Sequence, residues 1–316
     1  MVKTVNLEDV NVLLIEKNSE IRAVLRDGLR QRGIVKVTAV PTIEAAEKLL
    51  DEILFDIIIF EDVALAPETR SLAHAIRYGV VGNNPFQVLV TTMFSAEIPA
   101  VKRAINDGID NILAKPFSAL ALIDRVTALI HSRKSFAVTA SYIGPDRRLV
   151  PRAEVNLPLI EVPNTLRDKA FDRFDETRAR SQIATARSTV NTQKLIHGAQ
   201  LIASVTEQVA IHYESGIQDE TVRVHLDLLL ENTREIESRL ANTPDAHVAE
   251  LCGSFLKVLG DIRQNYLSPT KTEVSLMRNL GQAISASLKP DDKIAGLSKD
   301  IAGSVVEVRQ RLARDH

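Results

Sequence analysis

Four short apolar runs near the start of the chain each lead into side chains that could do polar chemistry. The runs begin at Val12, Ile57, Val88 and Ile112, and the polar residues that follow them are Glu16 and Lys17, Glu61 and Asp62, Thr92, and Lys115. Carboxylates hold hard cations or pair with ammonium groups, so charge neutralisation is the chemistry that this set offers. Because the carboxyl ends of parallel strands meet at one edge of a sheet, we expect the four sets of side chains to share one pocket.

The segments between these runs have the apolar period of helices, which predicts the elements that would position the pocket. Strands are expected at residues 10–15, 35–40, 55–60, 86–92 and 111–114, and helices at 19–32, 42–50, 68–78, 96–107 and 119–132. Five alternations of strand and helix in about 125 residues leave no room for hairpins. This order predicts an α/β fold with a five-stranded, parallel, doubly wound sheet over residues 1–135.

These residues resemble the receiver domain of bacterial two-component response regulators over about residues 9–133. The strongest marks are Lys115-Pro116-Phe117, the preceding Asp-Gly-Ile-Asp run at 107–110, and Thr92, which lies 23 residues before Lys115. The resemblance implies a pair of acids after the first strand and a phosphoacceptor aspartate after the third. It also implies a threonine or serine after the fourth strand and a lysine after the fifth, and Thr92 and Lys115 match these.

Three positions depart from the pattern that the resemblance implies. Lys17 stands where a second acid is expected, Glu61 occupies the phosphoacceptor position, and Ile112 replaces an aromatic residue that reorients in the family on activation. The expected pocket therefore has a composition that differs from that of a phosphorylatable receiver.

The charges of this pocket favour a degenerate receiver. Glu16 and Glu61 bring two negative charges, and Lys17 and Lys115 bring two positive ones, so an ammonium inside the pocket would compete with magnesium. We expect magnesium binding to be weak or lost and Glu61 to pair with Lys115. In the alternative, Asp62 or Glu61 still accepts a phosphoryl group, or these acids are solvated loop residues with no role.

Residues 136–163 interrupt the alternation with prolines and are expected to form an extended linker. They contain Gly144-Pro145-Asp146-Arg147-Arg148, which is similar to tails that follow receiver domains in some bacterial regulators. Arg147, Arg148 and Arg152 could dock an acidic partner, although a soluble tether is the favoured interpretation.

From residue 164 to 316 the periodicity predicts only helices. They are expected at 164–213, 219–240, 245–267, 270–288 and 291–313, which would form a bundle acting as an output or interaction domain. The long first helix could pair across a two-fold axis and give a homodimer. His197 is a weak candidate for phosphotransfer, and a phosphatase or phosphotransfer bundle is the alternative to a non-enzymatic one.

Composition narrows the class of function. Residues 1–135 hold 16 basic and 17 acidic side chains and residues 164–316 hold 20 and 21, so neither part has the basic excess of a nucleic-acid-binding domain. The single Cys252 and the absence of a long apolar run favour a cytoplasmic protein that does not insert into membranes. The sequence therefore predicts a non-enzymatic signalling protein of the response-regulator class, which binds protein partners and no nucleic acid.

Overall fold

The computed structural model describes residues 5–61, 71–94, 97–148, 158–216, 218–241 and 245–288. The chain divides into two compact units, an N-terminal unit (Met1–Val190) and a helical unit (Asn191–His316). The sequence predicts instead that the helical domain starts at residue 164. The difference arises because described residues beyond 135, among them Phe136, Leu166 and Ile183, pack in the cores of the N-terminal unit.

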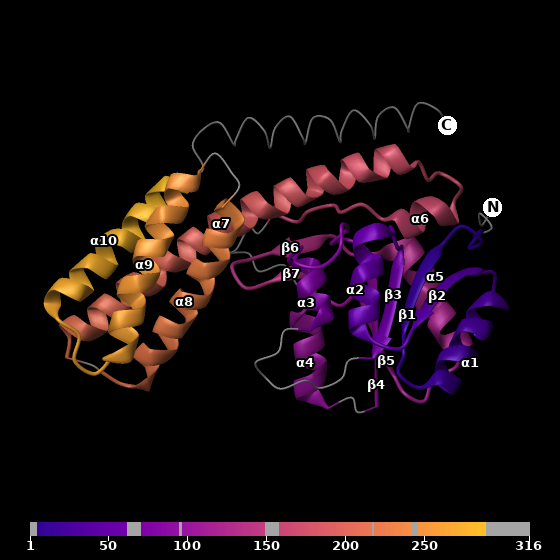
Figure 1. Ribbon diagram of the computed structural model, residues 1–316, viewed down its shortest axis with the longest axis horizontal. Helices are drawn as coiled ribbons and strands as arrows, with labels where there is room; N and C mark the ends of the chain where they lie inside the picture. Colours follow the sequence, from indigo (N-terminus) through magenta and orange to yellow (C-terminus); the bar gives the residue numbers. More distant parts are fainter. Residues whose placement is uncertain are drawn as a thin grey trace. The chain divides into compact units, whose positions relative to one another are not determined.

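A parallel sheet of five strands, in the order β2-β1-β3-β4-β5, organises the N-terminal unit (Figure 1). Its strands are β1 (Asn11–Ile15), β2 (Lys36–Val40), β3 (Ile57–Glu61), β4 (Val88–Met93) and β5 (Asn111–Ala114). The helices between and after them are α1 (Ser19–Arg30), α2 (Ile43–Glu52), α3 (Leu72–Arg77), α4 (Ile98–Asn106) and α5 (Ala119–Ser132). Each predicted strand and helix of this region has a counterpart in the structure. Residues 68–70 and residue 96, which begin two of the predicted helices, lie outside the described residues.

Apolar side chains fill both faces of the sheet because successive strand residues point to opposite sides. Val12 and Leu14 pack in a core with α1 and α5, whereas Leu13 and Ile15 pack with α2, α3 and α4. Continuous apolar strands of this kind are typical of a parallel sheet covered by helices on both sides. Glu16 directly follows β1 and therefore lies at the carboxyl edge of this covered sheet.

The stretch predicted as an extended linker is not a tether in its described part. It forms an antiparallel pair of short strands, β6 (Phe136–Val138) and β7 (Ile143–Pro145), and Phe136, Val138 and Ile143 are buried. These buried residues are packed rather than extended in solvent, whereas Arg148, among the described residues, hydrogen bonds only with Asp146, two residues before it. Arg147 donates a hydrogen bond of 3.0 Å to the carbonyl oxygen of Asp110 and another to that of Ile109. Arg152 lies outside the described residues.

Two glycines explain how this hairpin sits against the sheet. A Cβ added at Gly108 would lie 2.4 Å from the carbonyl oxygen of Ile143, and one added at Gly144 would lie 2.6 Å from the Cα of Gly108. Gly108 also has a φ of +80°, which favours glycine. The Asp-Gly-Ile-Asp run before β5 and the Gly-Pro-Asp-Arg-Arg run therefore contact each other directly.

The helix predicted at 164–213 is divided in two. A short α6 (Thr165–Ala170), capped by Asn164, is followed by a turn in which Asp172 has a φ of 54°, and α7 (Glu176–Glu214) then begins. The left-handed backbone at Asp172 is incompatible with a continuous helix. Leu166 and Ala170 of α6 are buried in the same core as β1 and α5.

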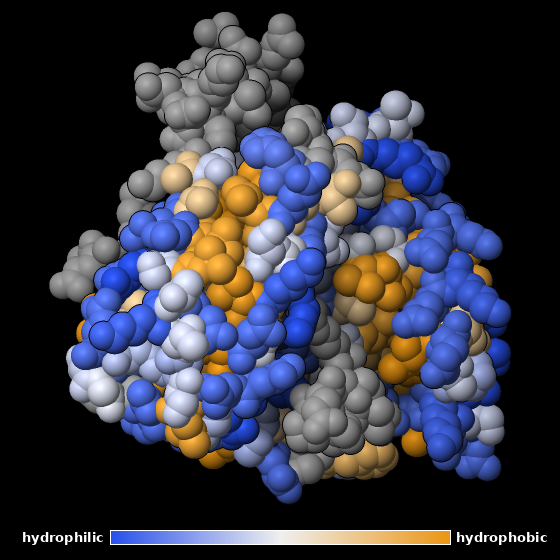
Figure 2. Space-filling model, turned by 60° about the vertical axis from the view of Figure 1, so that its left-hand side comes forward, coloured by the Kyte–Doolittle hydropathy of each residue, from blue (hydrophilic) through white to orange (hydrophobic). Residues whose placement is uncertain are grey.

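The helical unit consists, in its described part, of the later residues of α7 together with α8 (Glu220–Leu240), α9 (Ala246–Gln264) and α10 (Lys271–Ser287). One core joins these helices and includes Val209, Leu226, Phe255 and Met277. The helix predicted at 291–313 lies outside the described residues. Figure 2 shows apolar surface in patches bordered by hydrophilic side chains. In the described part of the chain, none of the helices combines the length and apolar character that crossing a membrane requires.

Candidate functional site

The ammonium group of Lys115 bridges two carboxylates at the carboxyl edge of the sheet. Its Nζ lies 2.8 Å from Glu16 Oε2 and 3.1 Å from Glu61 Oε1. The side chains of Lys115 and Glu16 are only 6% and 4% exposed, and that of Glu61 is 20% exposed. The ion pair expected between Glu61 and Lys115 is therefore present, and Glu16 shares the same cation.

Backbone hydrogen bonds help to position Lys115 and Glu16. The N–H of Lys115 donates to the carbonyl oxygen of Met93 at the end of β4, and Lys115 precedes Pro116 through a cis peptide bond. Glu16 Oε1 accepts a hydrogen bond of 2.9 Å from the N–H of Asn18, the residue that caps α1. A carboxylate with both oxygens engaged has little freedom to reorient, so the bridge is a constrained arrangement.

Phe94 adds an aromatic face that sequence reasoning missed. Lys115 Nζ lies 4.5 Å from the centroid of the Phe94 ring, within the range of a cation–π interaction, although Phe94 is 71% exposed. The only signal in the sequence is position, since Phe94 follows Thr92 by two residues in the loop after β4. The ring covers the cation and remains accessible to a partner.

Lys17 does not enter the pocket. It is exposed in the turn after β1, where its carbonyl oxygen accepts a hydrogen bond from Arg22. The expectation of two ammonium groups beside two carboxylates is therefore wrong, because a residue just beyond the strand end need not keep the strand's alternation. Lys115, Glu16 and Glu61 together carry one net negative charge. Asp62, the alternative acceptor, lies outside the described residues.

The two remaining predicted residues are near the bridge in the sheet. Thr92 is buried and is the register partner of Glu61 between β3 and β4. Ile112 is half-buried in β5 and packs against the core on the α2–α4 side of the sheet. The aliphatic side chain of Ile112 has neither a hydroxyl nor an aromatic ring that could respond to a change in the pocket.

The carboxylates that could hold a divalent cation are engaged by a lysine. Magnesium is held by oxygen ligands in a near-octahedral shell, and carboxylates supply most of the charge. Here the Lys115 ammonium lies between the two carboxylates that would have to turn towards the metal. In the part of the chain that the structure describes, three or more histidine, cysteine or acidic side chains do not come together as a metal site.

The candidates in the helical unit are less favourably placed for chemistry. The Nε2 atom of His197 is buried, and Nδ1 lies 3.3 Å from Gln200 Oε1, so a phosphoryl donor has no open path to Nε2. Asp219, which with Gln218 is the acid and amide pair that a phosphatase bundle would need, caps α8 by accepting a hydrogen bond from the N–H of Thr221, which is a structural role.

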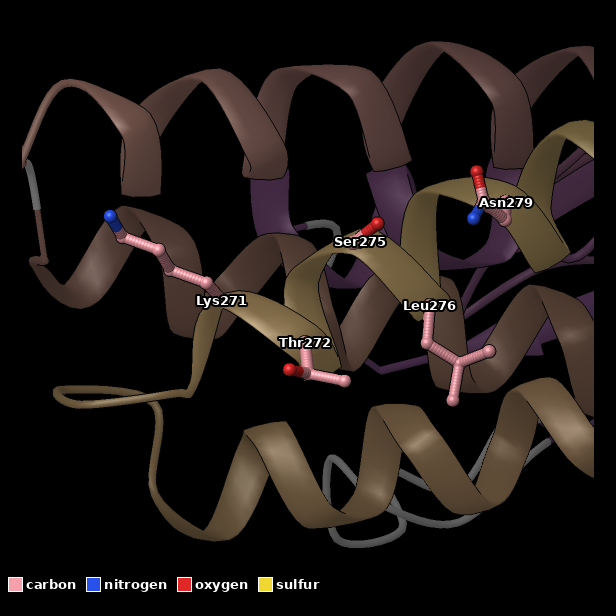
Figure 3. Close-up of a pocket in the computed structure, with 5 residues that line it drawn as sticks. All are labelled: Lys271, Thr272, Ser275, Leu276 and Asn279. Atoms are coloured by element: carbon pink, nitrogen blue, oxygen red, sulfur yellow. The ribbon is translucent and has the colours of Figure 1, made fainter.

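A cavity of about 410 Å³ lies on α10, but it does not gather converging groups. Its lining residues all come from this one helix, and their side chains fan outward (Figure 3). The residues are Lys271, Thr272, Ser275, Leu276 and Asn279. It is a groove on a helix surface.

A second group of buried charges, also missed by sequence reasoning, lies at the opposite edge of the sheet. Asp110 accepts hydrogen bonds from Arg77 at 2.7 Å and from Arg133 at 2.9 Å, and all three side chains are at most 5% exposed. Burial favours raising the pKa of Asp110, but Arg133 and Arg77 together lower it. Burial, with Arg133 adding to it and Asp110 opposing, lowers the pKa of Arg77 to about 10, so its guanidinium remains charged at neutral pH. This group fixes α3, α5 and the start of β5.

The strand order β2-β1-β3-β4-β5, with an acidic residue just after β1, another at the end of β3 and a lysine just after β5, is that of a response-regulator receiver domain. The N-terminal part of the chain has this fold, and a largely helical region follows it.

Comparisons with known proteins give the particular relatives. The chain is 31% identical over 156 residues to the transcriptional regulatory protein PrrA of Mycobacterium bovis and to that of Mycobacterium tuberculosis. Each match covers 46% of this chain, and the chain spans 62% of the length of these relatives. The chain matches no family model.

Solved structures similar to the N-terminal part include three response regulators. An orphan response regulator of H. pylori is 25% identical with a TM-score of 0.33, covering 38% of this chain and 96% of its own. A phosphorylated response regulator of Burkholderia pseudomallei is 26% identical with a TM-score of 0.32, covering 37% and 66%. An atypical orphan response regulator with a phosphorylation-independent mechanism is 26% identical with a TM-score of 0.33, covering 38% and 93%.

Proposed function

We propose that this chain is a non-enzymatic signalling protein of the response-regulator class whose receiver domain works without phosphorylation. The observation that carries the proposal is the Lys115 ammonium shared by Glu16 and Glu61. In a phosphorylatable site, a lysine and a metal ion neutralise charge that gathers on the transferred oxygens. Here the lysine is already engaged by two carboxylates.

The length of Glu61 supports the same conclusion. Its carboxylate reaches Lys115 directly and so occupies the side of the cation that an incoming phosphoryl group would need. The pair is largely buried, with the Lys115 side chain 6% exposed and that of Glu61 20% exposed, so the cation is shielded from solvent competition. We therefore propose that magnesium binding is weak or lost and that the bridge holds one conformation.

A phosphorylation assay tests the proposal. The full chain is incubated with a small phosphodonor and magnesium, and intact mass is measured. We expect no added phosphoryl group in the wild type. The Glu61→Asp variant, which shortens the side chain, is the matched comparison. Incorporation into wild-type Glu61 or Asp62 would overturn the proposal and make the protein a phosphorylation switch.

The proposed partner is a protein that contacts the exposed apolar residues beside the bridge. Phe94, Ile98 and Leu120 are 71%, 70% and 46% exposed, and they belong to the loop after β4, α4 and α5. Large exposed apolar side chains are typical of protein-binding surfaces. Pull-down with the full chain and with Ile98→Asp should give a partner that the variant fails to retain, whereas equal recovery would contradict this surface.

We also propose that the chain forms a homodimer. The support is the length of α7, which at 39 residues offers a long surface for pairing with a second copy. Sedimentation velocity on the full chain gives the test: a single species at the monomer mass across the micromolar range would rule the dimer out.

A further inference from the structure

The first turns of α7 form one wall of a second cavity in the N-terminal unit. This cavity has a volume of about 140 Å³. Arg180, Ile183, Ala184 and Arg187 line it from α7, and Leu54 and Asn83 line it from the residues that precede β3 and β4. Because Leu54 and Asn83 come before their strands, the cavity lies at the amino edge of the sheet, away from Lys115.

The spacing of the α7 residues explains why they share the cavity. Positions 180, 183, 184 and 187 are separated by three and four residues and so lie on one face of the helix. The two arginines stand at either end of this face, and the short side chain of Ala184 leaves space between them. An anion in this space would meet the Arg187 guanidinium, and the Arg180 guanidinium would join it on leaving Glu176, with which its Nε and Nη2 now hydrogen bond.

Arg187 is the informative residue. Its side chain makes no hydrogen bond or ion pair with any other residue in the described ranges, and its Nη2 lies 3.7 Å from the point where a Cβ at Gly79 would stand. Arg180 pairs with Glu176 on the same helix, at 2.7 Å and at an exposed site. An exposed pair of this kind contributes about 0.3–0.5 kcal/mol, so a ligand can displace it readily.

The remaining charges do not close the cavity to an anion. Asp51 is nearby, but its Oδ1 accepts a hydrogen bond from the N–H of Gly82, and its carbonyl oxygen accepts one from Asn83 Nδ2. Leu54 and Ile183 provide apolar walls. The cavity therefore combines two guanidinium groups, one amide and an apolar surround.

We propose that this cavity binds the dianionic phosphate group of a small molecule, either free phosphate or a phosphate monoester. A guanidinium presents paired N–H donors that match phosphate oxygens, and this pairing is stronger than a neutral hydrogen bond. A phosphate group needs roughly the volume of two or three waters, about 60–90 Å³, which the cavity can hold. The bound ligand would connect the start of α7 to the loop before β4. The chain would then respond to a phosphate-containing molecule at a site other than its receiver pocket.

Calorimetric titration of the full chain with inorganic phosphate, with adenosine monophosphate and with sulfate tests the proposal. We expect a Kd of about 1 mM or tighter for at least one of the two phosphate probes. Tighter binding of the monophosphate than of inorganic phosphate would identify a monoester as the ligand, and the reverse would identify free phosphate. Sulfate binding as tightly as both would overturn the proposal of a phosphate site.

Three variants make the test specific. Arg187→Gln removes the guanidinium that has no partner among the described residues, and Ala184→Leu fills the space without changing charge; each should weaken binding about tenfold or more. Arg125→Gln, at an exposed position of α5 remote from the cavity in sequence and element, should leave binding unchanged. Wild-type affinity in both cavity variants, or no binding of any probe below about 10 mM, would overturn the proposal. Neither result depends on whether Glu61 accepts a phosphoryl group, so this inference and the proposed function can fail separately.

Discussion

Lys115 is the residue on which the interpretation of the site depends. It is a largely buried cation with a carboxylate on each side and an aromatic ring over it, so its charge is satisfied by three groups of the chain itself. Removing it would leave Glu16 and Glu61 facing each other with no cation between them. Exposed Lys17, only one residue from Glu16, has no such role.

This contrast gives a stability prediction. Lys115→Met should lower the free energy of unfolding by about 3–5 kcal/mol, because it leaves uncompensated carboxylates in a largely buried site. Lys17→Met should change it by less than about 0.5 kcal/mol, since that side chain is exposed. Urea unfolding of the two variants measures the difference. Equal values would mean that the bridge adds nothing to the fold.

Asp110 gives a prediction about pH. Since Arg133 and Arg77 lower the pKa of Asp110 below its unfolded value, despite its burial, the folded state favours the ionised form. The stability from this group is present above the unfolded pKa of about 3.9 and is lost as the pH falls through the folded value. Asp110→Asn should therefore lose about 3–5 kcal/mol at pH 7, and the gap from wild type should shrink below pH 4.

Chemical denaturation at several pH values from 7 to 3 measures that gap. Asp124→Asn, at an exposed position of α5, is the matched control and should follow the wild type throughout. A gap that stays constant with pH would show that the ionisation of Asp110 does not contribute.

For single residues, the sequence predicts which side chains reach the pocket only when the end of a strand determines their position. Glu16 and Lys115 directly follow their strands, Glu61 ends β3, and Thr92 is the next-to-last residue of β4, opposite Glu61. Lys17 lies one residue further along, where the turn before α1 decides its direction. Phe94 is invisible to the pattern because nothing in the loop after β4 marks its ring as a partner of Lys115.

Among the elements, the β6–β7 hairpin lies where the sequence pattern predicts an extended linker. Each strand has three residues, too few for an alternating pattern to be recognised, and Gly144 and Pro145 are ordinarily turn residues. Its burial depends on partners far away in sequence, such as Phe86 and Ile183. By contrast, α1, α2 and α5 are predictable because their caps and apolar periods are local.

Phe136 anchors this hairpin. It is fully buried, contacts Phe86 edge to face with centroids 5.9 Å apart, and lies beneath the guanidinium groups of Arg77 and Arg133. Phe136→Ala should destabilise the protein by about 3–5 kcal/mol, as seen for buried aromatic truncations. Leu159→Ala, at a 45% exposed position, should cost less than about 0.5 kcal/mol. Thermal unfolding of both variants measures the difference. Equal midpoints would show that this segment is a mobile linker and not a packed hairpin.

Contact between α7 and α10 gives a prediction for the helical unit. A Cβ at Gly281 would lie 2.9 to 3.2 Å from three side-chain atoms of Thr206, so rotating Thr206 cannot relieve the clash. Gly281→Ala should destabilise by about 1–3 kcal/mol through overpacking. Gly260→Ala meets no atom within 4 Å and should stabilise α9 by about 0.5–1 kcal/mol. Circular dichroism during urea unfolding compares them, and a stabilised Gly281→Ala would contradict this packing.

For the whole molecule, charge balance sets the expected class of partner. The chain has a formal net charge of −2, with 39 basic and 41 acidic side chains. Phosphate neutralisation by basic side chains supplies most non-specific binding to DNA. Although the similar PrrA proteins are named as transcriptional regulators, we propose a protein partner for this chain.

Fluorescence anisotropy with a labelled random duplex tests this choice. We expect no binding at low micromolar protein and about 50 mM salt, where non-specific DNA-binding proteins associate most readily. Saturable binding that weakens steeply as salt is raised would show a basic surface assembled in three dimensions, and the proposed exclusion of nucleic acid would then be wrong.

The helix α7 limits how this gene could be rearranged. Ile183 and Val190 belong to one hydrophobic core, and Ile202 and Val209 belong to another, yet all four are on a single uninterrupted helix. Recombination that joined modules at a supposed linker after residue 163 would transfer the first pair away from the core that needs them. A hybrid built at that junction would begin with an uncovered apolar stripe, so shuffling of such modules is expected to succeed only when the whole helix travels with both of its cores.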